Sequence, residues 1–295
     1  MNQQKEWQTL SLANPSTLNE TIRELHHAAQ FIAMAGHSLL PGAEDDSNTN
    51  MGWSDEIGGL AGRVLPLNVP CRLALVYDSF ELRFVDKHYK TLRTLKLAGQ
   101  TKRTVRNWML EGLTDFGGRT DALQPVTHYE IPEHATDRGG SFRLTSTYDL
   151  RELARYRHNT KLILEELAVH FDNASSVRIW PHHFDTGMVI PAAINKEDQT
   201  IKSVGIGLAT PDENYNELYF YINHWVAAGG VTYAKLPELP SEGRWHRDGW
   251  VGAILLAADV VAHSEGSAQY EAVWRFFRAG INETLRLIGQ GEMTF

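Results

Sequence analysis

The stretch from Val177 to Ile190, VRIWPHHFDTGMVI, places two adjacent histidines and an aspartate just after a short apolar run. In an extended segment the side chains alternate, so His183 and Asp185 point to one face and His182 points to the other. An imidazole beside a carboxylate can share a proton or bind a metal ion, but a buried histidine held at a strand end has the same pattern. The sequence therefore predicts His183 and Asp185 as a substantially buried candidate catalytic pair.

Two later segments with alternating residues form a second candidate region. In SVGIGLA, Gly205 and Gly207 fall on one face, which has almost no side-chain volume. In LYFYIN, Tyr219 and Tyr221 share one face. We expect these tyrosines to cover the glycines from a paired strand; the alternative is a bound ligand that approaches the glycine backbone and meets the tyrosine hydroxyls.

Two polar loops rich in tryptophan are further candidates. The loop DDSNTNMGW either caps backbone groups after a helix or contributes to a site, and it departs from a calcium loop because Asn50 stands where glycine is required. The loop containing RWHRDGW either packs its tryptophans on the body or borders a binding cleft. The predicted ligand-binding residues are Asp45, Asp46, Trp53, Trp180, Tyr219, Tyr221, Trp245, His246 and Trp250. No metal ligands are assigned, and the cofactor is left open.

Composition limits the class of protein. The chain has 295 residues, of which 42% are hydrophobic and 22% charged, as in globular proteins that bury a sizeable core. A net charge of −8 offers nucleic-acid phosphates no general attraction, so a nucleic-acid partner is not expected. Cys71 is the only cysteine, and no run approaches the ~20 apolar residues of a membrane span. We therefore expect a cytoplasmic protein without a membrane partner; its oligomeric state is left open.

Periodicity predicts the elements. Apolar residues at three- and four-residue spacing predict helices, and alternating residues predict strands. The expected helices lie at residues 17–41, 101–113 and 150–171, and a terminal helix capped by Ser267 closes the chain. The expected strands lie in residues 72–86, 91–97, 176–181, 203–209 and 218–223. These blocks predict an α+β fold with antiparallel or mixed β-sheets packed by helices. We expect one compact unit over residues 1–295, with 1–140 and 141–295 as an alternative pair of similar helix–strands–helix halves and 137–141 as the seam.

Four segments together resemble a family of bacterial proteins known as a domain of unknown function. They are DDSNTNMGW, WPHHFD, SVGIGLATPDENYNELYFYI and RWHRDGWVGAIL, and the resemblance covers most of the chain. It implies a shared fold and a shared pocket, but no reaction. Asn48 stands where the family pattern more often has histidine, which weakens any scheme in which this loop supplies an imidazole to a metal.

Two functions of different classes follow from these residues. The favoured one is a small-molecule-binding protein in which the aromatic side chains line a pocket for a flat or sugar-like ligand. The alternative is a metal- or His/Asp-dependent enzyme that uses His183 and Asp185. The sequence has no nucleophile elbow, P-loop or complete dinucleotide-binding fingerprint that would favour a particular reaction.

Overall fold

The structure, a computed structural model, describes residues 3–11, 14–118, 123–233, 236–239 and 242–295. The fold is α+β, with two antiparallel β-sheets packed with α-helices, as the sequence predicts. Its contacts group into two compact units, which we name by their strands. The β1–β5 unit contains residues 18–154 and 178–184, and the β7–β11 unit contains residues 1–17, 155–177 and 185–295.

The β1–β5 unit is built on a sheet whose strands lie side by side in sequence order, with helices on one face. Its strands are β1 (Gly52–Ser54), β2 (Gly59–Ala61), β3 (Arg72–Val76), β4 (Glu81–Val85) and β5 (Thr91–Lys96). Its other elements are α1 (Asn19–Leu39), α2 (Lys102–Asp115), the 3₁₀ helix η3 (Ala135–Arg138) and the short strand β6 (Arg178–Ile179). The 3₁₀ helix η2 (Pro15–Leu18) precedes α1.

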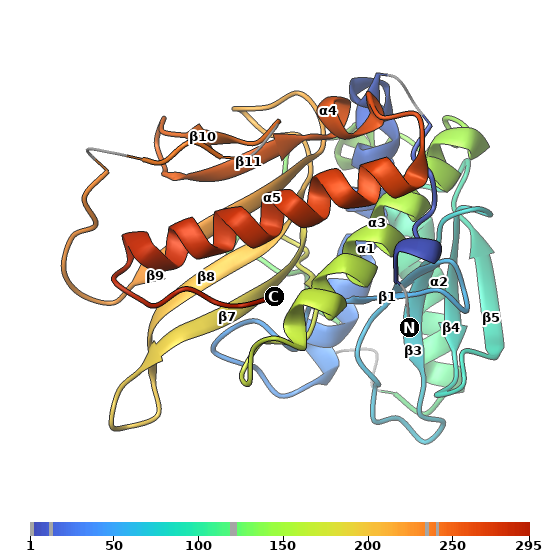
Figure 1. Cartoon of the computed structure of the whole chain (residues 1–295). Helices are drawn as coiled ribbons and strands as arrows, with labels where there is room; N and C mark the ends of the chain where they lie inside the picture. Colours follow the sequence, from blue (N-terminus) through green and yellow to red (C-terminus); the bar gives the residue numbers. More distant parts are fainter. Residues whose placement is uncertain (1–2, 12–13, 119–122, 234–235, 240–241) are drawn as a thin grey trace. The chain divides into compact units, whose positions relative to one another are not determined.

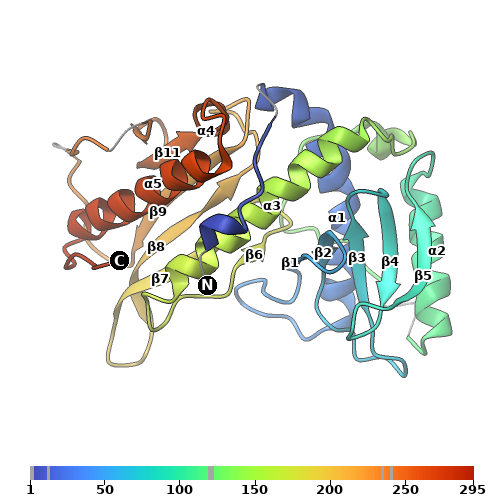
Figure 2. The same ribbon diagram turned by 45° about the vertical axis from the view of Figure 1, so that its right-hand side comes forward.

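Helices α1 and α2 pack on the same face of this sheet (Figure 2). Phe84 of β4 lies 5.1 Å from the Trp108 ring of α2, centroid to centroid, and shares its face with its cross-strand partner Leu73. Gly62 continues that face beyond β2, and the Ile32 side chain of α1 fills the space where its Cβ would stand. The face between the sheet and the two helices therefore forms the apolar core of this unit.

The β7–β11 unit is built on a longer antiparallel sheet. Its strands are β7 (Thr186–Ile194), β8 (Thr200–Ala209), β9 (Tyr219–Val226), β10 (Arg244–His246) and β11 (Gly252–Leu256), in the spatial order β10-β11-β9-β8-β7. Its other elements are the 3₁₀ helix η1 (Gln3–Lys5), α4 (Ala257–Val261) and α5 (Gly266–Leu287). Helix α3 (Thr147–Ala168) begins in one unit and ends in the other.

Helix α5 lies across this sheet and covers one of its faces (Figure 1). Phe220 of β9 meets the Phe277 ring edge-on at 5.9 Å, and a Cβ on Gly280 would stand 2.3 Å from the Ile222 side chain. Because side chains alternate along β9, Tyr219 and Tyr221 point to the opposite face. The sheet thus separates an apolar helix-packed face from a face that carries phenols.

The small-residue face of β8 is covered from β9, as the sequence predicts for one of its two glycines. Gly207 pairs with Tyr221, whose hydroxyl oxygen lies 2.8 Å from the place of a Gly207 Cβ. Gly205 pairs with Asn223, whose side-chain oxygen lies 2.3 Å from the equivalent place, so an amide rather than a tyrosine covers it.

Two local predictions are wrong, and one strand was not predicted. The strand predicted over residues 176–181 is only Arg178–Ile179, because the chain turns there: Phe184 donates its backbone N–H to the Trp180 carbonyl at 2.7 Å and has φ +55°. Strand β7, which follows this turn, was not predicted. Ser267 is not a cap, since α5 already begins at Gly266 after Glu265.

Among the described residues, no helix is long and apolar enough to cross a membrane.

Replacement of Gly207 tests the packing on this face. In Gly207→Val the new Cβ would stand 2.2 Å from the Thr186 carbonyl oxygen as well as against Tyr221, so we expect a loss of unfolding free energy of roughly 1 to 3 kcal/mol. Thermal and chemical denaturation measure it. Gly230→Ala is the control, because a Cβ at Gly230 meets no atom within 4 Å. Equal stability of the two variants would contradict this packing.

Candidate functional site

The β7–β11 unit brings together five of the residues predicted from the sequence. The Tyr221 hydroxyl donates to Asp185 Oδ2 at 2.7 Å. Its neighbour on the same face, Tyr219, donates to Asp212 Oδ2 at 2.6 Å. A continuous row of contacts runs through this face and ends at the next loop; the predicted residues in it are Asp185, Tyr219, Tyr221, His246 and Trp250.

Tyr215 links the tyrosine row to His246. The Tyr215 ring lies 4.8 Å from the Tyr219 ring, and its hydroxyl lies 2.8 Å from His246 Nδ1. His246 Nε2 lies 2.5 Å from the Asp248 carbonyl oxygen, which can only accept, so Nε2 carries the proton and Nδ1 accepts from Tyr215. The Trp250 ring lies 4.4 Å from the imidazole. His246 is therefore hydrogen-bonded at both nitrogens and packed between aromatic rings.

The phenols of this row are hydrogen-bond donors. Burial raises the pKa of Tyr221 well above its ordinary value, and the adjacent Asp185 carboxylate raises it further. Burial and the bond to Asp212 likewise raise the pKa of Tyr219. Both hydroxyls therefore keep their protons at neutral pH, and each donates to a carboxylate, half-buried in Asp185 and exposed in Asp212.

Trp245 lies apart from this row. Its pairing with Ala253 on β11 puts its side chain on the helix-packed face, while Arg244 and His246 point to the tyrosine face. The indole N–H of Trp245 donates to the Pro237 carbonyl at 2.7 Å, which ties the preceding loop to β10. The tryptophan thus anchors a loop, one of the two alternatives that the sequence leaves open.

The other predicted residues belong to the β1–β5 unit. Asp46 pairs with His128 at 2.8 Å, and Asp45 accepts from the Ser47 backbone N–H at 3.0 Å in a local turn. Trp53 is buried and donates to Asp55 at 2.7 Å, and Trp180 is half-buried. These contacts give the DDSNTNMGW loop internal hydrogen bonds and a bond to His128, and its contribution to a site stays a prediction.

The expected burial of His183 is wrong. His183 is exposed, His182 is half-buried, and both lie in the turn that replaces the extended segment. Asp185 follows that turn in the β7–β11 unit, so strand alternation does not relate it to His183. The reason is local: a bond closing five residues reverses the side-chain directions that an extended chain would have.

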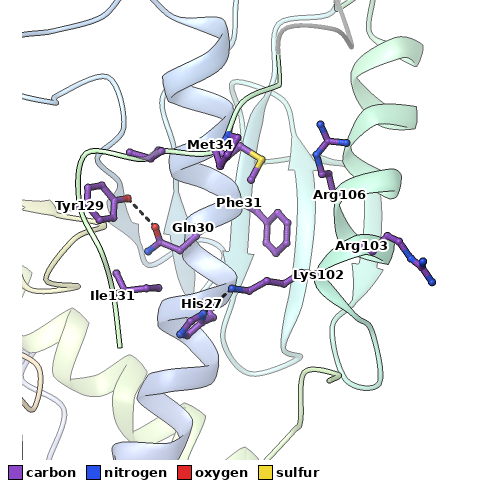
Figure 3. A pocket seen from close by; sticks show the side chains of 11 residues that line it. His27, Gln30, Phe31, Met34, Lys102, Arg103, Arg106, Tyr129 and Ile131 are labelled. Atoms are coloured by element: carbon purple, nitrogen blue, oxygen red, sulfur yellow. Dashed lines mark hydrogen bonds between the residues drawn. The ribbon is translucent and has the colours of Figure 1, made fainter. Parts of the chain in front are cut away.

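A cavity of about 410 Å³ lies in the β1–β5 unit (Figure 3). Helix α1 forms its base, the first turns of α2 form one wall, and the loop that leads to η3 forms the other. The lining residues are His27, Gln30, Phe31, Met34, Lys102, Arg103, Arg106, Pro125, Val126, Tyr129 and Ile131. This volume, and a mainly apolar surface that also carries polar and cationic groups, are compatible with a small-molecule site.

Lys102 and His27 meet at one end of this cavity. Buried His27 places Nε2 2.9 Å from the Pro132 carbonyl oxygen, which fixes the proton on Nε2. Its Nδ1 then accepts from the Lys102 ammonium at 3.0 Å, as Figure 3 shows. Burial, followed by the charge of Lys102, lowers the pKa of His27 from 6.5 to about 4. His27 is therefore neutral at physiological pH.

A hydrogen-bond network that runs from the exposed Asp137 to the buried His134 and Glu24 supports this pair. Lys102 also donates to Asp137 Oδ1, and Asp137 Oδ2 accepts from the His134 backbone N–H at 2.8 Å. The His134 ring stacks on His27 at 4.8 Å, and its Nε2 lies 3.2 Å from the buried Glu24 carboxylate. Burial acts to raise the pKa of Asp137, but its bonds to Lys102 and to His134 lower it overall, so the carboxylate stays charged.

The opposite side of the cavity is fixed by Tyr129 and Gln30. The Tyr129 hydroxyl donates to Gln30 Oε1 at 2.8 Å, and Gln30 Nε2 donates to the Pro181 carbonyl at 2.8 Å. Burial raises the pKa of Tyr129, and the charge of Asp46 raises it further, so the phenol stays protonated. The side chains of Phe31 and Met34 lie between this pair and α2 (Figure 3).

The described residues include no group of three or more His, Cys, Asp or Glu side chains placed to hold a metal ion. Comparisons with family models, with curated proteins and with solved structures each return no significant match. The resemblance to the bacterial family therefore stays a prediction, and the site rests on its own geometry.

The sequence did not predict this cavity as the site. Neither His27 nor its bond to Lys102 was predicted as part of a site. One signal was readable: α2 begins with Lys102 and Arg103 and has no acidic residue in its first turn. Cations oppose the helix dipole there, so their position is unfavourable unless another group compensates for it.

The neutral state of His27 predicts how stability varies with pH. The unfolded histidine takes up its proton near pH 6.5 and the folded one only near pH 4, so stability should fall as the pH drops from 6.5 to 4. His27→Gln should remove up to about 3 kcal/mol of this pH dependence. Denaturant unfolding across this range measures it. His88→Gln, at an exposed turn, should keep the wild-type slope, and a slope unchanged by His27→Gln would contradict the assignment.

The bond between Tyr221 and Asp185 predicts a second stability change. Tyr221→Phe leaves Asp185 without this donor, and hydrogen bonds to charged groups contribute about 1.5 to 3 kcal/mol, so we expect a loss of that size. Chemical denaturation measures the loss. Tyr89→Phe keeps the ring that faces Arg72 and removes a hydroxyl, at a half-buried position, that is bonded to no carboxylate of the described residues, so it should change stability little. Equal values for both variants would show that the Tyr221 hydroxyl contributes nothing.

Proposed function

We propose that this protein binds a small, apolar, ring-containing molecule in the cavity between α1, α2 and the loop of residues 125–131. The observation that carries the proposal is the cavity itself: about 410 Å³, with a lining surface that is mainly apolar although six of the eleven lining residues carry polar groups. Such a distribution supplies binding energy through burial and orientation through a few hydrogen bonds.

The walls suit a flat ligand. The ring of Phe31 at the base and the ring of Tyr129 in the loop offer apolar surfaces, and Met34 can adjust to the shape of what lies between them. The polar atoms of Tyr129 and Gln30 are already bonded to each other. A ligand ring can therefore enter without leaving these buried groups unpaired.

Binding is favoured over catalysis because the titratable groups at the cavity are engaged. His27 uses both ring nitrogens, and burial keeps it neutral with a lowered pKa. Tyr129 is held protonated by a raised pKa. Neither group is poised to exchange a proton near neutral pH, as a general acid or base must. The enzyme alternative with His183 and Asp185 stays a prediction, but it has lost the extended geometry on which it was based.

A neutral fluorescent probe tests the proposal. N-phenyl-1-naphthylamine is flat and uncharged, so we expect it to bind with one-to-one stoichiometry and enhanced emission. Met34→Trp should fill the cavity and weaken this binding by about tenfold or more, since wrong volumes in a packed site cost over 1 kcal/mol. Fluorescence titration measures both.

Leu144→Trp is the matched control, because it adds the same ring at an exposed position of the same unit. It should bind the probe like the wild type. If the wild type shows no saturable binding, or if both tryptophan variants weaken binding equally, the cavity is not the site.

A further inference from the structure

The charged side chains that line the cavity are all cations. Lys102, Arg103 and Arg106 line it, and no aspartate or glutamate does. This local excess stands against a net charge of −8 for the whole chain. Figure 3 shows the Lys102 side chain passing over the base of the cavity, whereas Arg103 directs its guanidinium away from α1. Arg106 donates to the Leu123 carbonyl at 3.2 Å, so Lys102 is the cation that lies over the base of the cavity.

Lys102 is held in a fixed position. Its ammonium donates to His27 Nδ1 from α1 and to Asp137 Oδ1 from η3, two acceptors on elements far apart in the chain. An ammonium has three hydrogens, so one remains for a ligand oxygen at a site whose other bonds are already made. A donor oriented in advance loses little conformational entropy when a ligand binds.

The position of Lys102 is not explained by helix stability. A cation in the first turn of a helix opposes the dipole, and α2 has two cations there and no acid. Local rules are most often broken where a functional requirement opposes them. Asp137 already offsets part of this conflict through its ion pair with Lys102, and a further anion at the cavity would offset more of it.

Asp137 limits the charge of that anion. Its carboxylate touches the same ammonium and remains ionised, so it partly neutralises Lys102 and repels a second negative group. A carboxylate or another singly charged oxyanion is compatible with this environment. A doubly charged phosphate would be opposed by Asp137 more strongly.

We infer that the ligand of this cavity is an apolar monoanion whose carboxylate-type oxygens accept a hydrogen bond from Lys102 while its ring lies against Phe31. The inference rests on the proposed function and narrows its ligand class. Lys102 is then the residue that selects anions, and Asp137 the residue that selects a single charge over a double one.

Two matched probes test the charge preference. 8-Anilinonaphthalene-1-sulfonate is N-phenyl-1-naphthylamine with one sulfonate added, so the pair differs only in a single negative charge. The wild type should bind the sulfonate at least about tenfold more tightly than the neutral probe, as expected for a charge-assisted hydrogen bond. Equal or weaker binding of the sulfonate would overturn the inference and leave the proposed function standing. Absence of binding by both probes would overturn both.

Removal of the Lys102 charge tests whether this residue causes the preference for the anionic probe. Lys102→Met should bind both probes with similar affinity, at about the wild-type affinity for the neutral one. Lys96→Met, which removes the same charge from an exposed position on β5, should keep the wild-type ratio. A ratio that survives in Lys102→Met would overturn the assignment to Lys102. The wild-type comparison does not depend on the folding of either variant.

Competition distinguishes the kind of anion. At about pH 8, 1-naphthoate carries one charge and 1-naphthyl phosphate two. Displacement of the neutral probe by 1-naphthoate should need about tenfold less competitor than displacement by 1-naphthyl phosphate. 1-Naphthalenemethanol, the uncharged counterpart of 1-naphthoate, should compete more weakly than 1-naphthoate. If the phosphate proves the tighter ligand, the monoanion preference is overturned.

Discussion

The constraint on which the β1–β5 unit depends most is the placement of one ammonium group, that of Lys102. The partly buried cation needs acceptors, and it finds them in the His27 imidazole and the Asp137 carboxylate. His27 can serve only if it is neutral, and burial together with the cation itself lowers its pKa enough to keep it so. Burial and, after it, the charge of Lys102 therefore determine the protonation state of the imidazole that holds this ammonium.

This arrangement extends outward from Lys102 through hydrogen bonds of defined direction. The Pro132 carbonyl fixes the tautomer of His27, and the His134 backbone N–H orients Asp137. The capping box that begins η3 is made by His134 and Asp137, so the turn that ends this loop and the support of Lys102 use the two oxygens of one carboxylate. Helices α1 and α2 and the loop to η3 are thus tied together around one end of the cavity, and this leaves its apolar walls open to a ligand.

The β7–β11 unit resolves a similar problem in a different way. Its buried phenols are each paired with a carboxylate, and the Tyr221 side chain fills the space above Gly207. His246 is bonded at both nitrogens. The polar residues most conspicuous in the sequence are here satisfied by one another, which stabilises the sheet and leaves few groups for a ligand.

The sequence by itself determined the α+β class, the hairpin around Asp78 and Ser79, and the cover of Gly207 by a tyrosine, because these features follow from periodicity and from pairing between near neighbours. It could not fix the turn after Trp180, where a single local bond overrides the alternation that His183 was expected to follow. It also could not identify the cavity: His27 lies 75 residues before Lys102, and Asp137 lies 35 after it. Periodicity reports only which face of an element is apolar, whereas a cavity and its charged end depend on which distant side chains the packed helices and loop bring within hydrogen-bonding distance, so only the tertiary structure decided them.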